Sequence, residues 1–191
     1  MKLKIIPVGF LQANCYIVSD QNGIAAVIDP GDDAERILGY LQDNSLQCKK
    51  IMLTHGHYDH TGGVQEIRKK TGASLVMNSA DRQVLTVDFD IDEPVSDGDI
   101  ITVGDLNFKV IAVPGHSMGG VCYLICDTLF TGDTLFAGSI GRSDFPGSDT
   151  EMLMASLKRL KELPQDDLNV YPGHGPATTL KHERALNPYL R

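Results

Sequence analysis

The stretch Thr54-His-Gly-His-Tyr-Asp-His60 is the most informative part of this chain of 191 residues. It follows the apolar run Ile51-Met-Leu53, which is typical of a buried strand, so the histidines are expected where that strand ends. His55 and His57 would project from the same side of an extended segment and can bind one ion. Asp59 and His60 lie beyond the bend, where a helix is expected to begin, and can point to a second ion. Imidazole and carboxylate groups suit zinc, iron and manganese, so the pattern predicts a metal site.

Other residues of the same types follow predicted strands further along the chain. His116 and His174 each come after a Pro-Gly pair, and Asp133 comes directly after the run that ends at Gly132. The complete set of candidate metal ligands is His55, His57, Asp59, His60, His116, Asp133 and His174. This set is too large for one tetrahedral ion, and it favours two ions that share a carboxylate and leave room for water. We expect two divalent metal ions as cofactors, zinc first, with iron or manganese as alternatives.

Hydrophobic periodicity predicts a first group of strands and helices in the N-terminal half. Strands are expected over residues 2–8, 14–19, 25–29, 50–53 and 74–78. A helix is expected where Ala34, Ile37 and Leu41 fall on one face, and another runs from Val64 to a stop at Gly72. Residues 79–99 are polar and mixed, with a short helix near 80–85 and an acidic loop after it.

A second group of strands and helices follows in the C-terminal half. Strands are expected over residues 100–103, 106–113, 121–126, 128–132 and 168–171. Leu153, Leu157 and Leu160 predict a helix, and Ser148 with Glu151 has capping-box spacing at its start. A short final helix is expected near residue 181. The order predicts an α/β fold in which two sheets pack together with their helices outside, as one domain over residues 1–191.

The amino-acid composition argues against several classes of function. Lys and Arg total 17 against 25 Asp and Glu, a formal net charge of -8, which argues against a nucleic-acid partner. No apolar run is long enough to span a membrane, and Pro7 and Gly9 interrupt the N-terminal segment where a signal peptide needs a continuous apolar region. The four cysteines are scattered, as expected for free thiols in a reducing compartment, so we expect a cytoplasmic location.

The series of histidines and aspartates resembles the metallo-β-lactamase superfamily, in particular its short glyoxalase II-like (hydroxyacylglutathione hydrolase-like) branch. The resemblance covers essentially the whole chain, including Asp29-Pro-Gly31, Thr131-Gly-Asp-Thr-Leu-Phe136 and Glu183-Arg-Ala-Leu-Asn-Pro188. It implies an αβ/βα four-layer sandwich of the metallo-β-lactamase type.

The resemblance also implies a role for each candidate ligand. It assigns one metal to His55, His57 and His116, the other to Asp59, His60 and His174, and the bridging position to Asp133. Asp29 matches a residue that orients a ligand histidine from outside the metal site. Its alternative role is that of a turn aspartate at the end of a strand.

Two features differ from the longer glyoxalase II enzymes. Those enzymes carry a C-terminal helical extension that binds much of the glutathione, whereas this chain ends soon after His174. The segment Gly141-Arg-Ser-Asp-Phe145 replaces a lysine-containing segment, and similar stretches occur in short glyoxalase II-like proteins and in persulfide dioxygenases. Arg142 is the cation expected to bind a substrate carboxylate; alternatively it pairs with Asp144 or Glu151.

The leading functional hypothesis is a dinuclear metallohydrolase that cleaves a small thioester such as hydroxyacylglutathione through a metal-bridging hydroxide. Asp59 and Asp133 are the expected catalytic carboxylates, which orient the hydroxide and take up its proton. The alternatives are a persulfide dioxygenase with a single iron, and a hydrolase of another ester, lactone or lactam. The segment Tyr171-Pro-Gly-His174 weighs against the dioxygenase because it supplies the second metal site. The expected partner is a small-molecule thioester, with no nucleic acid and no membrane.

Overall fold

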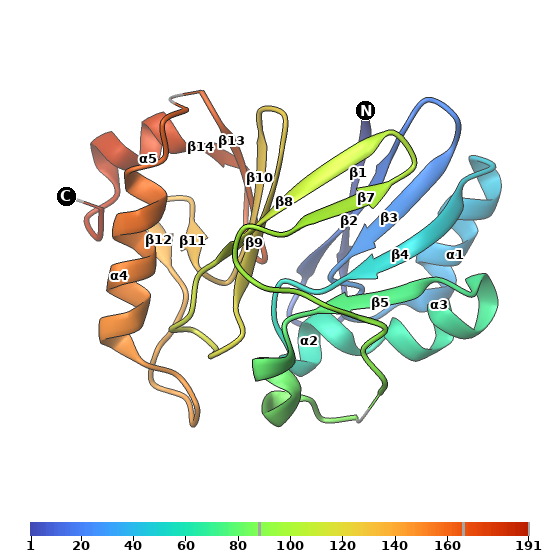
Figure 1. Cartoon of the computed structure of the whole chain (residues 1–191), viewed down its shortest axis with the longest axis horizontal. Coiled ribbons are helices and arrows are strands. Elements are labelled where there is room, and N and C mark those ends of the chain that lie inside the picture. Colours follow the sequence, from blue (N-terminus) through green and yellow to red (C-terminus); the bar gives the residue numbers. More distant parts are fainter. Residues whose placement is uncertain (88, 166, 191) are drawn as a thin grey trace.

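Two sheets packed face to face form the centre of the protein (Figure 1). The computed structural model describes residues 1–87, 89–165 and 167–190. The first six-stranded sheet consists, in spatial order, of β1 (Lys2–Val8), β2 (Ala13–Ser19), β3 (Ile24–Ile28), β4 (Gln47–Met52), β5 (Ser74–Met77) and β6 (Glu93–Pro94). The second has the order β14 (Thr178–Thr179), β13 (Asn169–Pro172), β10 (Thr128–Gly132), β9 (Val121–Ile125), β8 (Leu106–Ala112) and β7 (Ile100–Val103). A small hairpin pairs β11 (Leu135–Phe136) with β12 (Ser139–Ile140).

Helices cover the outer face of each sheet, so the predicted αβ/βα four-layer sandwich is confirmed (Figure 1). The first sheet is covered by α1 (Ala34–Asp43) and α3 (Val64–Thr71), and the second by α4 (Thr150–Lys161) and α5 (Leu180–Leu186). The short helix α2 (Tyr58–Thr61) lies in the connection between β4 and α3, and a 3-10 helix spans Ser79–Val84. None of the helices in the described parts of the chain is long and apolar enough to cross a membrane.

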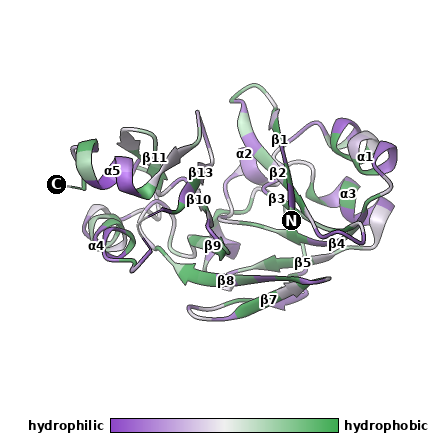
Figure 2. Cartoon of the chain, turned by 90° about the horizontal axis from the view of Figure 1, so that it is seen from above, coloured by the Kyte–Doolittle hydropathy of each residue, from purple (hydrophilic) through white to green (hydrophobic). Residues whose placement is uncertain are grey.

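Successive side chains of the central strands point alternately to the two faces of the sheet, and this alternation produces the layers. In β2, Cys15 and Ile17 belong to the core under α1 and α3, whereas Tyr16 and Val18 belong to the core between the sheets. Successive side chains of a strand point to opposite faces, so a strand covered on both sides is apolar throughout. In Figure 2 the strands are accordingly mostly green, while the helices carry both colours.

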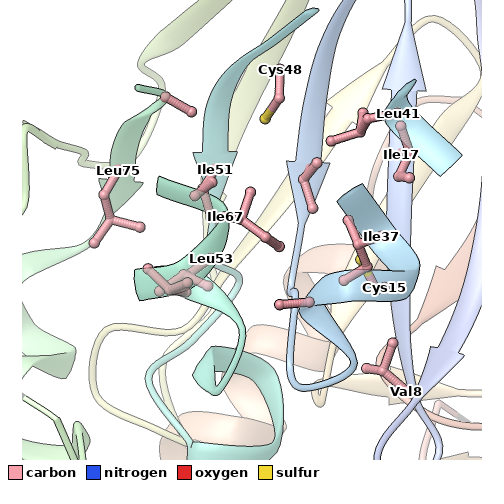
Figure 3. Close-up of a cluster of buried hydrophobic side chains, with 14 of the residues drawn as sticks. Val8, Cys15, Ile17, Ile37, Leu41, Cys48, Ile51, Leu53, Ile67 and Leu75 are labelled. Carbon is pink, nitrogen blue, oxygen red and sulfur yellow. The ribbon is translucent and has the colours of Figure 1, made fainter. Parts of the chain in front are cut away.

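The core under α1 and α3 shows how the helices attach (Figure 3). Helix α1 directs Ile37 and Leu41 onto the sheet, where Ile17 and Ile51 lie, and α3 adds Ile67. Burying one such side chain fully contributes about 1.5–3 kcal/mol. Helix α3 ends as predicted, with Gly72 in the left-handed region at φ 70°.

Some local features differ from the sequence-based expectations, including the start of α4 and several two-residue strands. The N-cap of α4 is Asp149, whose carboxylate accepts a hydrogen bond from the Met152 N–H, rather than Ser148. Strand β6 lies inside the segment expected to be an acidic loop, and it pairs in parallel with β5. A two-residue strand that contains a proline has no periodicity by which a sequence could reveal it.

The strand directions bring distant loops together. Strand β3 pairs in parallel with β4, and β10 pairs in parallel with β13, so within each sheet the carboxyl ends of these strands meet at one edge. The loops that follow β4, β8, β10 and β13 contain every predicted metal ligand outside α2.

Candidate metal centre

The loop after β4 carries the first two candidate ligands. His55 is 3% exposed, and His57 occupies the N-cap position of α2 with extended backbone angles of φ -67° and ψ 152°. The chain then turns into α2, which carries Asp59 and the fully buried His60. The change from extended backbone to helix at Tyr58 therefore separates the four side chains into two directions.

The first cluster contains His55, His57 and His116, each of which offers a nitrogen within 4.8 Å of the others. His57 Nδ1 lies 2.9 Å from His116 Nε2. His116 Nδ1 lies 2.7 Å from the backbone carbonyl oxygen of Arg142, which only accepts hydrogen bonds, so Nδ1 carries a proton and the Nε2 of a neutral His116 has a free lone pair. A cation between the rings would satisfy these nitrogens.

The second cluster contains Asp59, His60 and His174, whose offered atoms again lie within 4.8 Å of one another. His174 Nε2 is 3.2 Å from Asp59 Oδ2, and His60 Nε2 is 3.6 Å from the same oxygen. On its other side, His60 Nδ1 lies 3.2 Å from Oδ2 of the buried Asp29. That contact leaves Nε2 of His60 directed toward the cluster.

Asp133 lies between the two clusters. Its Oδ2 is 3.6 Å from His116 Nε2 in the first cluster and 3.6 Å from His174 Nε2 in the second. Its Oδ1 is 3.5 Å from His60 Nε2. Gly173 makes this approach possible, because a Cβ at that position would lie 2.1 Å from Asp133 Oδ1.

Buried atoms without hydrogen-bond partners show that these residues fit a metal. His55 Nε2, His60 Nε2 and Asp133 Oδ1 are all buried and have no hydrogen-bond partner in the described chain. Leaving a buried polar atom unsatisfied costs about 1–3 kcal/mol, which a coordinated cation would remove. The mixed nitrogen and oxygen donors are those that zinc, iron and manganese accept.

A third possible grouping joins Asp29 to His55 and His60. Asp29 already accepts hydrogen bonds from the Thr54 N–H at 2.7 Å and the Thr54 hydroxyl at 2.6 Å. Its oxygens are therefore occupied in holding the loop that leads to His55, and it suits a supporting role better than that of a ligand.

The pKa shifts show that the local field favours positive charge in the second cluster. Burial lowers the pKa of His60, but Asp133, followed by Asp29 and Asp59, outweighs burial and raises it to about 9. Burial raises the pKa of Asp59, but the hydrogen bond from His174 and the charge of His60 lower it to about 2. By contrast, burial and then the neighbouring imidazoles hold the pKa of His55 well below its ordinary value, so this ring is neutral. Neutral imidazoles and ionised carboxylates are the forms that bind metals, so His55 and Asp59 already have that form, whereas His60 would release a proton when a cation binds.

A cavity of about 740 Å³ opens above the two clusters. His57, His116, Asp59, Asp133 and His174 belong to its lining, together with mostly apolar walls from Leu11, Tyr58, Val84, Phe136, Phe145 and Pro146. Such a cavity is within the size range of small-molecule sites.

Arg142 also lines the cavity, but its guanidinium already has a partner. Its Nε and Nη2 each donate to one carboxylate oxygen of Asp144 at 2.9 Å, and it lies over the Phe145 ring at 4.3 Å from the centroid. The alternative of pairing with Asp144 is therefore the observed one, at the edge of the predicted substrate site. His182 is exposed on α5 and is not part of the cavity lining.

Asp81 was not singled out from the sequence, yet its carboxylate contacts the loops of both sheets that carry candidate ligands. It is fully buried and accepts from the Gly56 N–H and the Ser117 hydroxyl. It lies in the polar segment 79–99, where nothing in the residue pattern distinguishes a buried aspartate from a solvated one.

A family model, a sequence relative and two solved structures all relate this chain to the same group of proteins. The family description "Metallo-beta-lactamase superfamily" matches residues 8–174. The chain is 35% identical to "Hydroxyacylglutathione hydrolase GloC" of Haemophilus influenzae, with 100% of this chain and 98% of that protein covered. Among solved structures, it is similar to the BLEG-1 B3 metallo-beta-lactamase, with a TM-score of 0.93, 33% identity and 99% of both chains covered. It is also similar to TTHA1623 in a di-iron-bound form, with a TM-score of 0.88, 36% identity and 98% and 100% of the two chains covered.

The match runs from Val8, the last residue of β1, to His174, and it includes every loop that carries a candidate ligand. It therefore concerns the site as well as the scaffold. The chain belongs to the metallo-beta-lactamase superfamily.

Proposed function

We propose that this protein is a dinuclear metallohydrolase that cleaves a small thioester such as hydroxyacylglutathione. The observation that carries the proposal is the arrangement of two ligand clusters joined by Asp133 at the floor of one cavity. Two ions a few ångströms apart form a centre suited to hydrolysis. The relative named hydroxyacylglutathione hydrolase supports the thioester class.

Each candidate ligand then has one role. His55, His57 and His116 bind one metal, Asp59, His60 and His174 bind the other, and Asp133 bridges them. Asp29 fixes the ring of His60 through the 3.2 Å contact to Nδ1, so that Nε2 faces the metal. Zinc is the expected metal, and iron or manganese are the alternatives; the di-iron form of TTHA1623 favours iron among them.

The remaining chemistry is divided between the carboxylates and the cavity. When bound, the two ions would supply a hydroxide at neutral pH and polarise the carbonyl oxygen of the substrate. Asp59 and Asp133 orient the attacking water through their carboxylates and take up its proton. The apolar walls hold the acyl group, and Arg142 contacts the polar part of the substrate at the rim. We assign all of these parts to one domain over residues 1–191.

A second candidate reaction is β-lactam hydrolysis at the same site. The similarity to the BLEG-1 B3 metallo-beta-lactamase over 99% of both chains favours it. A persulfide dioxygenase with a single iron is less favoured, because Asp59, His60 and His174 form a complete second cluster.

Metal analysis followed by a substrate panel tests the proposal. We expect two metal ions per chain and hydrolysis of acyl-glutathione in preference to acyl-CoA, lactone and β-lactam substrates. If two metals are bound and no thioester is hydrolysed, the thioesterase proposal is wrong. Preferential opening of the β-lactam would establish the second candidate instead, and one iron per chain with oxygen uptake on glutathione persulfide would establish the dioxygenase.

A further inference from the structure

The carboxylate of Asp81 lies outside both ligand clusters, in the 3-10 helix Ser79–Val84 that connects β5 to β6. It is 0% exposed, although it carries a group that is rarely buried unless it is fully hydrogen-bonded. Oδ2 accepts from the Gly56 N–H at 2.9 Å and from the Ser117 hydroxyl at 2.7 Å. Oδ1 accepts from the Gly119 N–H. One buried carboxylate therefore satisfies three donors.

The positions of these donors connect Asp81 with the first metal cluster. Gly56 is the residue between His55 and His57, in the loop after β4 of the first sheet. Ser117 follows His116 directly, in the loop after β8 of the second sheet. The three nitrogens of the first cluster thus come from two loops on different sheets, and Asp81 hydrogen-bonds to both loops beside the ligands themselves.

The backbone around Asp81 is packed as tightly as its side chain. A Cβ at Gly119 would lie 2.6 Å from the Asp81 nitrogen, and a Cβ at Gly56 would lie 2.8 Å from the Asp81 carbonyl oxygen. Both loops therefore rest directly on the 3-10 helix, and only glycine fits at these two contacts. A shift of Asp81 would move both loops.

A metal cluster whose ligands come from two sheets needs contacts that fix the two ligand loops relative to one another. His57 Nδ1 and His116 Nε2 lie 2.9 Å apart, although the loops that carry them follow β4 and β8, which belong to different sheets. Hydrogen bonds to an ionised carboxylate are about twice as strong as neutral ones, so a charged acceptor suits a position that must fix both loops.

We propose that Asp81 is a positioning residue, which sets the geometry of the His55–His57–His116 metal cluster by holding the two loops at a fixed separation. This inference rests on the proposed metal centre and adds a determinant of its affinity. Asp81 does not touch the metal or the substrate in this proposal; it acts through the loops.

Asp81→Asn is the informative substitution, because it preserves the shape of the side chain. An amide has one oxygen acceptor, and its NH₂ group only donates. Whichever way the amide is turned, its NH₂ faces the N–H of either Gly56 or Gly119, and that N–H loses its acceptor. We expect the loop on that side to move and the affinity of the first cluster for zinc to fall.

Asp20→Asn is a matched control. Asp20 is also buried, at 4% exposure, and its carboxylate accepts from the backbone N–H groups of Asn22, Ile24 and Asp105. It lies after β2, at the end of that strand opposite to the Asn14 side chain, which hydrogen-bonds to Pro172 and Gly175 beside His174. The control loses the same kind of hydrogen bond far from the metal loops.

The experiment is a zinc titration of the full chain against a chromogenic chelator, which resolves two binding steps. We expect Asp81→Asn to weaken one step by about 10–100-fold, the usual effect of losing a residue that supports a metal ligand, and to leave the other within about twofold. His174→Ala is expected to weaken the other step. Asp20→Asn is expected to change neither step, even where it lowers the melting temperature.

Ser117→Ala keeps the proposal testable if Asp81→Asn does not fold. It removes one donor and retains the carboxylate, so the same zinc step is expected to weaken by about fivefold. Unchanged zinc affinity in the folded variants, or an equal loss in Asp20→Asn, would overturn the positioning role. Wild-type chain that binds two zinc ions without hydrolysing a thioester would overturn the proposed function alone, while a chain that binds neither zinc, iron nor manganese would overturn both.

Discussion

His57 Nδ1 lies 2.9 Å from His116 Nε2, although the two residues are 59 positions apart and follow strands of different sheets. His116 Nδ1 donates to the carbonyl oxygen of Arg142, so the lone pair of a neutral His116 is on Nε2. The short contact therefore directs this lone pair at the ring of His57. Two imidazole nitrogens in this arrangement are most stable with a cation between them.

Removal of the metal is expected to destabilise the protein. An ion bound only by the folded chain stabilises it by about 2.7 kcal/mol when its free concentration is 100 times the dissociation constant. The melting temperature should therefore fall after treatment with a chelator and recover when zinc is added back. A melting temperature that is the same with chelator and with zinc would contradict the presence of a metal centre.

His116→Ala is expected to lower zinc stoichiometry and to reduce hydrolysis by about 100-fold or more, because it removes a ligand from the first cluster. His182→Ala is the control, since His182 is exposed on α5 and not in the cavity lining. Zinc content and kcat/KM measured on both variants check the assignment. Equal effects of the two substitutions would show that His116 has no special role.

Gly173→Ala is expected to impair metal binding without removing a ligand. The new methyl group would lie 2.1 Å from Asp133 Oδ1 and 2.8 Å from His60 Cε1, so the bridging carboxylate would have to move. A displacement of about 1 Å at a reacting centre costs on the order of 100-fold in rate. The control is Gly39→Ala in α1, where a Cβ has no atom within 4 Å and helix propensity predicts about 0.5–1 kcal/mol of added stability. Normal zinc affinity in Gly173→Ala would contradict the predicted position of Asp133.

Asp144→Asn is expected to improve the use of anionic substrates. In the wild-type chain, Asp144 occupies the Nε and Nη2 donors of Arg142, one of the two donor pairs with which a guanidinium can bind a substrate carboxylate. As an attached competitor it is always present at high effective concentration. The ratio of kcat/KM for an anionic and a neutral thioester of equal size should rise by only a few-fold, because solvent screens an exposed ion pair. The same ratio in Asp97→Asn, where the pair with Arg159 lies outside the cavity lining, should stay constant.

Low pH is expected to weaken the contacts through which Asp97 connects Arg159 of α4 with Ala112 of β8. Arg159 donates to Asp97 and holds the pKa of this carboxyl below its ordinary value, and the Ala112 N–H adds to the effect. The unfolded chain therefore binds the proton at a higher pH than the folded chain. The ionised Asp97 therefore adds to the free energy of unfolding above the pKa of an unfolded aspartate, which is about 4. This contribution is lost as the pH falls through the lower pKa of the folded chain.

Urea unfolding of chelator-treated protein between pH 3 and pH 7 measures this dependence. The effect should be small, on the order of 0.5 kcal/mol, because both side chains are nearly half exposed. Asp97→Asn should unfold with a correspondingly shallower pH dependence. An identical pH profile for both chains would contradict the depressed pKa of Asp97.

Local patterns in the sequence were sufficient for the longer strands, the helices and the set of candidate ligands. The alternation in β2 and the spacing of Leu153 and Leu157 depend on the geometry of one element, which the sequence encodes directly. The segment from Thr54 to His60 is equally local, because the change from extended chain to α2 separates its side chains. The division of the seven residues between two metals follows from family resemblance and stays a prediction; six of these residues lie in two clusters, and Asp133 lies between them.

The tertiary structure alone decided what depends on two distant segments. The contact of Asp81 with both metal loops and the pairing of β6 with β5 leave no periodic trace in the sequence. A buried aspartate and a solvated one have the same residue letter, and only packing of the two sheets brings the Gly56, Ser117 and Gly119 donors to Asp81. The sequence by itself therefore indicated which residues are candidate metal ligands, whereas the packing of the two sheets decided how closely they approach one another and which contacts hold them there.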